Sequence, residues 1–523
     1  MYPMFSWAIV LGVASLGTAF PSSPVARDGS SSFPYYEYNA TRADAVKAAF
    51  RHGWDGYYQY AFPHDSLRPV SNTWEDDRNG WGASAVDAFS TALVMGDQEV
   101  IDQILDYVPT INFDNTTTEV SLFETTIRYL GGLLSAYDLL TGPLSDYASD
   151  KDKVDSILSQ AKRLADNLKV AFTTPSGVPD NNLYFDPPRI ANSTTNGIAT
   201  IGTLVLEWTR LSDLTGNPEY GELAQKGESY LLDPQPALGE PFPGLIGTNV
   251  NVSNGNFLDS SGGWTGGTDS FYEYLIKMWL YDPTRFGLYK DRWILAADSS
   301  IKYLASHPTS RPDLTFLAYY NNATTLDFFS EHLACFDGGN FILAGLELNT
   351  PKYVAFGLTL VDGCRDTYAS TATHIGPEEF RWVDSRHRPA SDAVPDDQAG
   401  FYGAHGFWIT SSGYVLRPEV MESYYYAYRA TGDPKYQEWA WEAFVAINET
   451  CAAGSGYSSI DDVNVVGGGG FDDFQESFWF AEVLKYSYLI HAEDAPFQVK
   501  ADHTNEFVFN TEAHPVRIVG KPR

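Results

Sequence analysis

Two junctions of nearly identical sequence constrain the fold of this chain more than any other feature. Residues 215–220 read Thr-Gly-Asn-Pro-Glu-Tyr and residues 431–436 read Thr-Gly-Asp-Pro-Lys-Tyr, with looser versions at 95–97 and 141–143. Glycine suits the left-handed position after a helix and proline suits the first turn of the next helix, so each junction joins two helices in a hairpin. Repeated αα-hairpins bury their apolar faces only by stacking, which predicts either an open solenoid or a closed α/α toroid.

Apolar residues recur at three- and four-residue spacing along most of the chain, which indicates amphipathic helices. We expect helices over 43–60, 83–93, 154–172, 203–214, 271–280, 293–304, 353–361, 418–428 and 474–490. Long alternating β-branched runs are scarce, and the glycine-rich stretches 262–267 and 467–470 follow no convincing strand, so we expect both as loops. The sequence therefore predicts an all-α fold with small β-hairpins in its loops.

The charge of the chain excludes one class of partner. Lys and Arg number 34 and Asp and Glu number 67, for a net charge of −33. A charge of that sign and size repels polyanions, so nucleic acid is excluded as a partner, and anionic membrane surfaces are disfavoured.

The N-terminus predicts entry into the secretory pathway. Its apolar stretch of roughly 15 residues is too short to span a bilayer, and Gly17 and Ala19 are small residues placed as in a signal-peptide cleavage site. A positive charge at the start is missing, and a buried N-terminal helix is the alternative. We expect a signal peptide over 1–19, a flexible leader over 20–40, one catalytic domain over 41–518 and a tail over 519–523. No other segment is apolar for 18 residues, so the mature form is expected to have no membrane anchor.

Six Asn-x-Ser/Thr sites and three cysteines agree with a secreted protein. The glycosylation candidates are Asn39, Asn115, Asn192, Asn251, Asn322 and Asn448. Three cysteines allow one disulfide and one free thiol in an oxidising compartment, with three possible pairings. Cys335 and Cys364 enclose the shortest loop, so we predict that they are bridged, for a contribution of ~3 kcal/mol, and that Cys451 is free. Without a Cys-x-x-Cys motif, the three do not indicate a zinc site.

Acidic residues stand inside apolar helical segments, where a charge is costly unless it is paired or hydrogen-bonded. They are Glu124 with Arg128 one turn on, Asp269 and Glu273 four apart, Glu419 and Glu422 three apart, and Glu476 and Glu482 around an aromatic turn. Taken singly, each pair fits a satisfied structural pair. Together they predict one acidic cavity that performs acid/base chemistry, holds a hard cation, or does both. Such a cavity favours the closed toroid.

Several separated motifs carry a resemblance to a known family. The segments 120–130, 269–274, 416–419, 482–486 and 508–515 resemble, in order, those of class I α-1,2-mannosidases, which form glycoside hydrolase family 47; 78–82, 332–336 and 376–378 also match. The resemblance runs from about 42 to 516 and is strongest to the secreted filamentous-fungal members. It implies an (α/α)7 barrel, a bound Ca²⁺, and inverting removal of terminal α-1,2-linked mannose from high-mannose oligosaccharides or glycoproteins. We expect a monomer.

The resemblance also implies a role for each matching residue. Glu124 matches the general acid, thought to act through a water, and Glu419 matches the general base. Asp269 matches a third essential carboxylate, which in this family is sometimes assigned the acid or base role. Glu378 matches a further active-site acid, and Thr511 matches the residue whose carbonyl and hydroxyl ligate calcium. Contacts to the sugar or to the waters around calcium are expected from Arg128, Glu273, Arg417, Glu422, Glu476, Glu482 and Glu512. Cys335 and Cys364 match the family disulfide.

Three points leave the function open. The Pro- and Asp-rich stretch that follows Glu378, up to residue 413, is longer than the family pattern. Family members that stop after one mannose carry Arg two residues before Asp269; Gly267 stands there, which implies Golgi-like trimming to the five-mannose core, unless other barrel loops decide specificity. The rivals are a glycan-binding quality-control lectin on the same barrel, and a glucoamylase-like α/α-barrel hydrolase, which the Thr511 motif opposes.

Overall fold

Helices dominate the computed structural model, which describes residues 34–384 and 393–520. The α-helices are α1 (Ala40–Tyr60), α2 (Ala83–Met95), α3 (Gln98–Tyr107), α4 (Leu122–Glu124), α5 (Gly131–Leu140), α6 (Lys151–Leu168), α7 (Ile198–Gly202), α8 (Val205–Thr215), α9 (Glu219–Leu232), α10 (Asp269–Tyr281), α11 (Gly287–Ser299), α12 (Asp337–Glu347), α13 (Pro351–Ala369), α14 (Ala399–His405), α15 (Glu419–Thr431), α16 (Pro434–Thr450) and α17 (Leu484–Leu489). Short 3₁₀ turns and three π-helical segments extend several of them.

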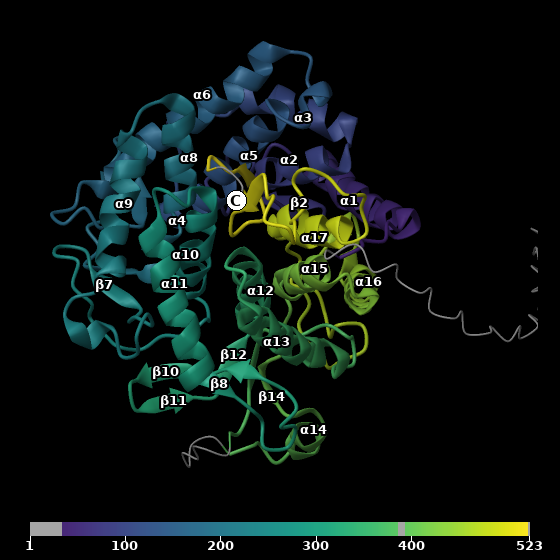
Figure 1. Cartoon of the computed structure of the whole chain (residues 1–523). Helices are drawn as coiled ribbons and strands as arrows, with labels where there is room; N and C mark the ends of the chain where they lie inside the picture. The colour runs from purple at the N-terminus through teal and green to yellow at the C-terminus, as the bar shows by residue number, and fades with distance from the viewer. Residues whose placement is uncertain (1–33, 385–392, 521–523) are drawn as a thin grey trace, which may run out of the picture. The chain divides into compact units, whose positions relative to one another are not determined.

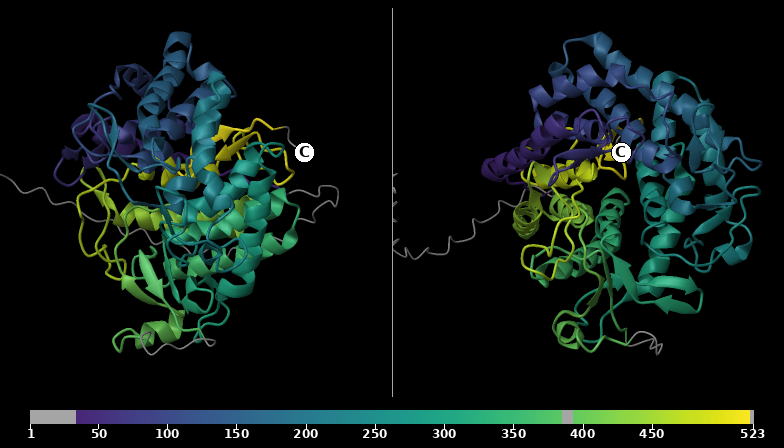
Figure 2. Two further views of the ribbon diagram at one scale, coloured as in Figure 1. Left: turned by 90° about the vertical axis from the view of Figure 1, so that its left-hand side faces the viewer. Right: turned by 180° about the vertical axis from the view of Figure 1, so that it is seen from behind.

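Two rings of helices make up the barrel (Figures 1 and 2). In the inner ring, α2, α5, α8, α10, α12, α15 and α17 contact one another in that order, and α17 closes the ring by contacting α2. Six outer helices pack on the inner helix that precedes each of them in the chain; they are α3, α6, α9, α11, α13 and α16. The seventh outer helix, α1, packs on α17 from the other end of the chain. The described residues therefore form seven inner and seven outer helices, which confirms the predicted (α/α)7 barrel.

The predicted helix junctions have the geometry that their sequences require. Gly216 ends α8 at φ 71° and Gly432 ends α15 at φ 63°, both in the left-handed region that suits glycine. The N–H of Gly432 donates to the carbonyl of Tyr428 at 2.8 Å, and Pro434 then opens α16 behind an Asp433 cap. Each junction turns the chain from one ring to the other.

The predicted helix over 474–490 is wrong at its start. Residues 474–476 are extended, because the N–H of Gln475 donates to the carbonyl of Leu67 at 3.0 Å and its side chain accepts from the N–H of Tyr457 at 2.8 Å. Regular helix begins only at Trp479, as a π-helical turn that runs into α17. The helix predicted over 293–304 likewise ends as α-helix at Ser299 and continues as a π-helical turn.

All strands are short, as expected for hairpins in loops. They are β1 (Ser66–Arg68), β2 (Thr73–Glu75), β3 (Val120–Ser121), β4 (Asn182–Tyr184), β5 (Arg189–Ile190), β6 (Thr195–Gly197), β7 (Asn249–Asn251), β8 (Ala305–Ser306), β9 (Phe316–Leu317), β10 (Tyr319–Asn322), β11 (Thr325–Asp327), β12 (Phe329–Glu331), β13 (Glu379–Arg381), β14 (Trp408–Ser411), β15 (Ala452–Ala453), β16 (Gly456–Tyr457), β17 (Phe507–Phe509) and β18 (Pro515–Arg517). Two antiparallel three-stranded sheets, β3-β4-β5 and β12-β13-β14, join segments far apart in sequence. Both glycine-rich stretches are loops, as predicted.

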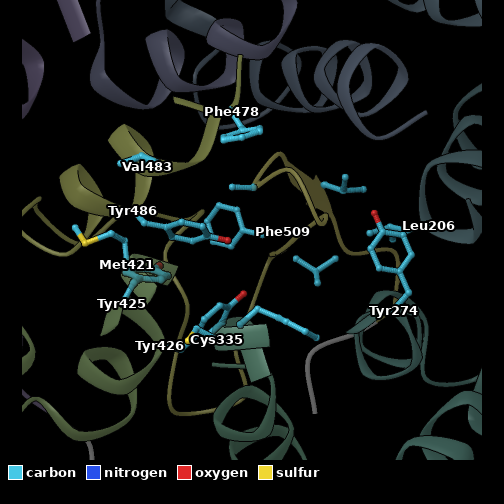
Figure 3. Packing of buried hydrophobic residues seen from close by; sticks show 14 of the residues in the cluster. Leu206, Tyr274, Cys335, Met421, Tyr425, Tyr426, Phe478, Val483, Tyr486 and Phe509 are labelled. Atoms are coloured by element: carbon cyan, nitrogen blue, oxygen red, sulfur yellow. The ribbon is translucent and has the colours of Figure 1, made fainter. Parts of the chain in front are cut away.

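The C-terminal hairpin of β17 and β18 packs inside the ring, against α10 and α5 (Figure 1). Phe509 packs against the rings of Tyr425 and Tyr486, with centroids 6.2 Å and 5.9 Å away (Figure 3). These contacts bury the hairpin in the apolar core, so the turn between its strands has a fixed place among the inner helices.

The structure also bears on the ends and the cysteines. Cys335 and Cys364 form the predicted disulfide, and Cys451 is a buried free thiol. Residues 34–39 of the predicted leader pack against α15, where the Tyr36 hydroxyl donates to the carbonyl of Arg429 at 2.6 Å. The predicted signal peptide, the rest of the leader and the last three residues lie outside the described residues. Among the described helices, none has the length and apolarity needed to cross a membrane.

Candidate active site

A cavity of about 390 Å³ opens at the N-terminal ends of inner helices. Asp269 and Glu419 are the first residues of α10 and α15, and Glu124 closes α4 just before the inner helix continues. Helix N-termini carry partial positive charge, so the fold places carboxylates where they are stabilised. The predicted site residues that line this one cavity are Glu124, Arg128, Asp269, Glu273, Arg417, Glu419, Glu422, Glu476, Glu482, Thr511 and Glu512.

Glu378 is placed differently. It is absent from the described residues that line the cavity, and its carboxylate lies behind Arg417. One oxygen accepts from Nε of Arg417 at 2.5 Å and the other from the N–H of Val415 at 3.1 Å. The geometry gives Glu378 the task of holding Arg417 in the cavity wall.

Arg128 joins several acidic groups on one side of the cavity. Its Nε donates to Oε2 of Glu124 at 2.9 Å, and its Nη1 contacts Glu512 and lies 3.5 Å from Asp87. Burial alone would raise the pKa of Glu124, but the charges of Arg128 and, 3.7 Å away, Arg78 outweigh it and hold the pKa below its usual value. Glu124 is therefore ionised at neutral pH.

Glu419 has a different partner. Nδ1 of His332 lies 2.8 Å from its Oε2. Burial pushes the pKa of Glu419 up, but the His332 hydrogen bond and the charge of Arg417 bring it below its ordinary value. A buried carboxylate that stays ionised is suited to accept a proton from water.

Asp269 has the opposite electrostatics. Burial raises the pKa of Asp269 to about 7, and the negative charges of Glu273 and Glu331 add to the rise. The N–H of Ser270, which donates to Oδ1 at 2.7 Å, lowers the pKa but does not outweigh burial. The cavity therefore brings together a carboxyl that keeps its proton in weak acid and a carboxylate that does not. That contrast is what acid/base catalysis by two carboxyl groups requires.

The turn between β17 and β18 carries Thr511 and Glu512 into the same cavity. Asn510 shapes the turn: its side-chain oxygen accepts from the N–H of Glu512 at 3.0 Å and of His514 at 2.8 Å, while its amide donates to the carbonyl of Ile127 at 3.0 Å. The turn is thereby fixed to the inner helix that begins beside Glu124.

The residues beside Thr511 fit a hard cation. Burial raises the pKa of Glu422 to about 8, against the attraction of Lys277, and burial also raises the pKa values of Glu482 and Glu512 well above the usual range. The positive charges nearby, Arg128 beside Glu512 and Lys277 near Glu422, do not offset the burial of these carboxyls, and a divalent ion would add the charge that does. Across residues 34–384 and 393–520, neither the hydroxyl nor the carbonyl of Thr511 has a hydrogen-bond partner, so both are free to ligate.

The carboxylates are not arranged to ligate a metal directly. In the described chain, no three His, Cys, Asp or Glu side chains are grouped so that they could hold an ion. A cation at Thr511 would therefore be completed by waters, which the neighbouring carboxylates would orient.

Sequence reasoning missed two residues of the site. His332 contacts Glu419, and Arg78 lines the cavity beside Glu124. Both stand in motifs that carry the family resemblance, 332–336 and 78–82, so the sequence did offer a signal for them. Nothing in the sequence indicated the π-helical segments Thr125–Leu130 and Trp479–Val483, which carry Arg128 and Glu482 into the cavity. Such segments occur often at functional sites.

Comparison with known proteins identifies the family. The family model for glycosyl hydrolase family 47 matches residues 49–518. A probable mannosyl-oligosaccharide alpha-1,2-mannosidase 1B of Aspergillus niger is 58% identical over 98% of this chain and 99% of its own length. A mannosyl-oligosaccharide alpha-1,2-mannosidase of Penicillium citrinum is 58% identical over 92% of each chain. The solved alpha-1,2-mannosidase from Trichoderma reesei superposes with a TM-score of 0.91 at 58% identity, over 92% of this chain and 100% of its own.

The family model matches nearly the whole barrel, and the solved structure superposes over it closely. Together these findings exclude another barrel family, such as the glucoamylase-like enzymes. The chain belongs to glycosyl hydrolase family 47.

Proposed function

We propose that this chain is a calcium-dependent exo-α-1,2-mannosidase that removes terminal α-1,2-linked mannose from high-mannose N-glycans with inversion. The observation that carries the proposal is one cavity, in a family 47 barrel, that holds an ionised Glu419, a protonated Asp269 and the free ligand atoms of Thr511. The similar fungal proteins named above bear the same activity in their names.

Glu419 is the general base in this proposal. Its ionised carboxylate takes a proton from the water that attacks the anomeric carbon, on the face opposite the leaving sugar. His332 holds one carboxylate oxygen at 2.8 Å, which leaves the other for that water.

The proton for the leaving sugar comes, in this proposal, from Asp269 and Glu124, which both line the cavity. The family resemblance gives the acid role to Glu124 through a water. Because Arg128 and Arg78 keep the pKa of Glu124 low while burial raises that of Asp269 to about 7, we propose that Asp269 stores the proton. Glu124 then acts in the relay through which the proton reaches the glycosidic oxygen.

The carbonyl and hydroxyl of Thr511 would hold the calcium ion, with waters oriented by Glu422, Glu482 and Glu512. When bound, the ion supplies a positive charge that can ligate sugar hydroxyls and offsets the repulsion among the carboxylates. Arg417, held by Glu378, lines the same cavity and is placed to donate to a sugar hydroxyl.

Open space beside Asp269 supports broad specificity. A Cβ at Gly267 would meet no atom within 4 Å, and the φ of Gly267 is +87°. No side chain there selects one glycan branch, so we propose that every α-1,2-linked mannose is admitted, down to the five-mannose core. A lectin that binds without turnover is not favoured, because the residues expected as acid, base and calcium ligand are all present in the sequence.

We propose further that the protein is secreted as a monomer and acts on glycoproteins or free oligosaccharides in or beyond the secretory pathway. Support comes from the signal-like start, from six Asn-x-Ser/Thr sites and from a disulfide that persists only under oxidising conditions.

The test is a digest of a nine-mannose glycan, read by mass, with enzyme that has been stripped with a chelator and with the same enzyme resupplied with Ca²⁺. We expect products down to five mannoses with Ca²⁺, none without it, and a lower melting temperature for the stripped protein. Full activity after stripping would reject the calcium dependence, and absence of trimming in both samples would reject the mannosidase activity.

A further inference from the structure

Behind the proposed base, a chain of hydrogen bonds leads out of the cavity to the outer ring. His332 bonds Glu419 through Nδ1, and its Nε2 lies 2.7 Å from the hydroxyl of Tyr368 on the outer helix α13. Tyr368 is 1% exposed and His332 2% exposed, so both bonds lie inside the protein. Tyr368 does not line the catalytic cavity.

The direction of each bond follows from the acceptors. An ionised carboxylate only accepts, so the ring nitrogen that faces Glu419 must carry a hydrogen. In a neutral imidazole, Nε2 then has a lone pair, and a donor must fill it because a buried acceptor without a partner costs free energy. The Tyr368 hydroxyl is the group within reach. The neighbouring Tyr414 hydroxyl donates elsewhere, to the carbonyl of Arg417 at 3.0 Å.

We propose that Tyr368 is a positioning residue for the catalytic base: by donating to Nε2, its hydroxyl fixes His332 in the tautomer that presents Nδ1–H to Glu419. The inference rests on the proposed function, since it gives Tyr368 a task in the same reaction. Without the hydroxyl, the imidazole can move its hydrogen to Nε2. The Nδ1 lone pair then faces the carboxylate, and the bond that orients Glu419 is lost.

The charged groups around Glu419 stay the same when this hydroxyl is removed. Arg417 attracts its negative charge, while Glu422 and Glu482, from α15 and from the segment before α17, repel it. Tyr414 faces it as a neutral phenol. A change in the titration of Glu419 in a Tyr368 variant therefore reports the hydrogen bonds of the Tyr368 hydroxyl and not a change in the charges around Glu419.

The main experiment is Tyr368→Phe in the full-length protein, assayed for mannose release from an α-1,2-linked disaccharide. We expect kcat to fall about 10- to 100-fold, as for other residues that orient a functional histidine, with KM nearly unchanged. The acidic limb of the kcat/KM profile, which reports ionisation of the base, should move to higher pH, because the bond that keeps Glu419 ionised is weakened.

Tyr424→Phe is the matched control. Tyr424 is also a fully buried tyrosine, on the neighbouring helix α15, but among the described residues its hydroxyl has no hydrogen-bond partner. Loss of that hydroxyl should leave kcat and the pH profile as in the wild type. A melting curve for each variant reports folding.

Two results would overturn the proposal: wild-type kcat in folded Tyr368→Phe, or a fall in kcat without a shift of the acidic limb. If Tyr368→Phe does not fold, 3-fluorotyrosine at position 368 decides, because it keeps the hydroxyl and makes it a stronger donor. The acidic limb should then move to lower pH, and an unmoved limb would reject the idea. Wild-type protein that releases no mannose would instead reject the proposed function.

Discussion

Asp269→Asn tests the assignment of the proton donor most sharply. The change keeps the shape of the side chain and an oxygen for the N–H of Ser270, but removes the titrating proton. With a pKa of about 7, Asp269 is protonated in about 97 of 100 molecules at pH 5.5. At the ordinary pKa of 3.8 the fraction would be about 2 in 100. The burial of this carboxyl therefore keeps Asp269 protonated, and so able to act as an acid, at a pH where an exposed aspartate would be ionised.

The assay compares two substrates that differ in their need for an acid. When an α-1,2-linked mannobiose is hydrolysed, the second mannose leaves as an alkoxide unless its oxygen is protonated. α-Mannosyl fluoride expels fluoride, which leaves without a proton. We expect Asp269→Asn to lose about 10²–10⁴-fold in kcat/KM on the disaccharide and far less on the fluoride. In the wild type, the kcat/KM profile should fall on its alkaline side near pH 7, where Asp269 loses its proton. This alkaline limb should disappear in Asp269→Asn and persist in Glu124→Gln, since Glu124 is already ionised. Equal losses on both substrates, or an alkaline limb that survives in Asp269→Asn, would refute the assignment.

Three further predictions follow from the same cavity and its frame. Glu419→Gln should lose about 10²–10⁴-fold in kcat on both the disaccharide and the fluoride, because both reactions need a base. As a control, the variant should bind mannose as the wild type does in a titration, and near-normal turnover would show that Glu419 is not the base. Gly267→Arg should slow the later trimming steps of a nine-mannose glycan more than the first, as read by mass; unchanged product ratios would show that other loops set specificity. Replacing Cys335 and Cys364 by Ala should lower the free energy of unfolding by ~3 kcal/mol in urea, and non-reducing peptide maps should leave Cys451 unlinked.

The fold could be predicted because its signals are local. Glycine and proline at 215–220 and 431–436 mark the turns between rings, and three- and four-residue spacing marks most of the helices. The failures come from long-range contacts. Residues 474–476 carry a helical apolar pattern, yet Gln475 bonds Leu67, some 400 residues earlier, and that pairing outweighs helix propensity.

The site was predictable in its residue types but not in its electrostatics. Carboxylates inside apolar helices indicated an acidic cavity, and the family resemblance supplied their roles. The spacing of four residues between Glu124 and Arg128 indicates their pairing. The burial that raises the pKa of Asp269 arises only once the barrel has formed, so the sequence does not show it. Tyr368 carried no signal at all, because only the packing of α13 against the turn that follows His332 brings its hydroxyl to that histidine.

The most direct test of the central claim is the anomer and linkage of the first product. Proton NMR of a fresh reaction with α-1,2-linked mannobiose distinguishes β-mannose, the product of inversion, from α-mannose before the two equilibrate. The account predicts β-mannose first, with α-1,3- and α-1,6-linked mannobiose left intact. Release of α-mannose first, or equal cleavage of the other linkages, would contradict it.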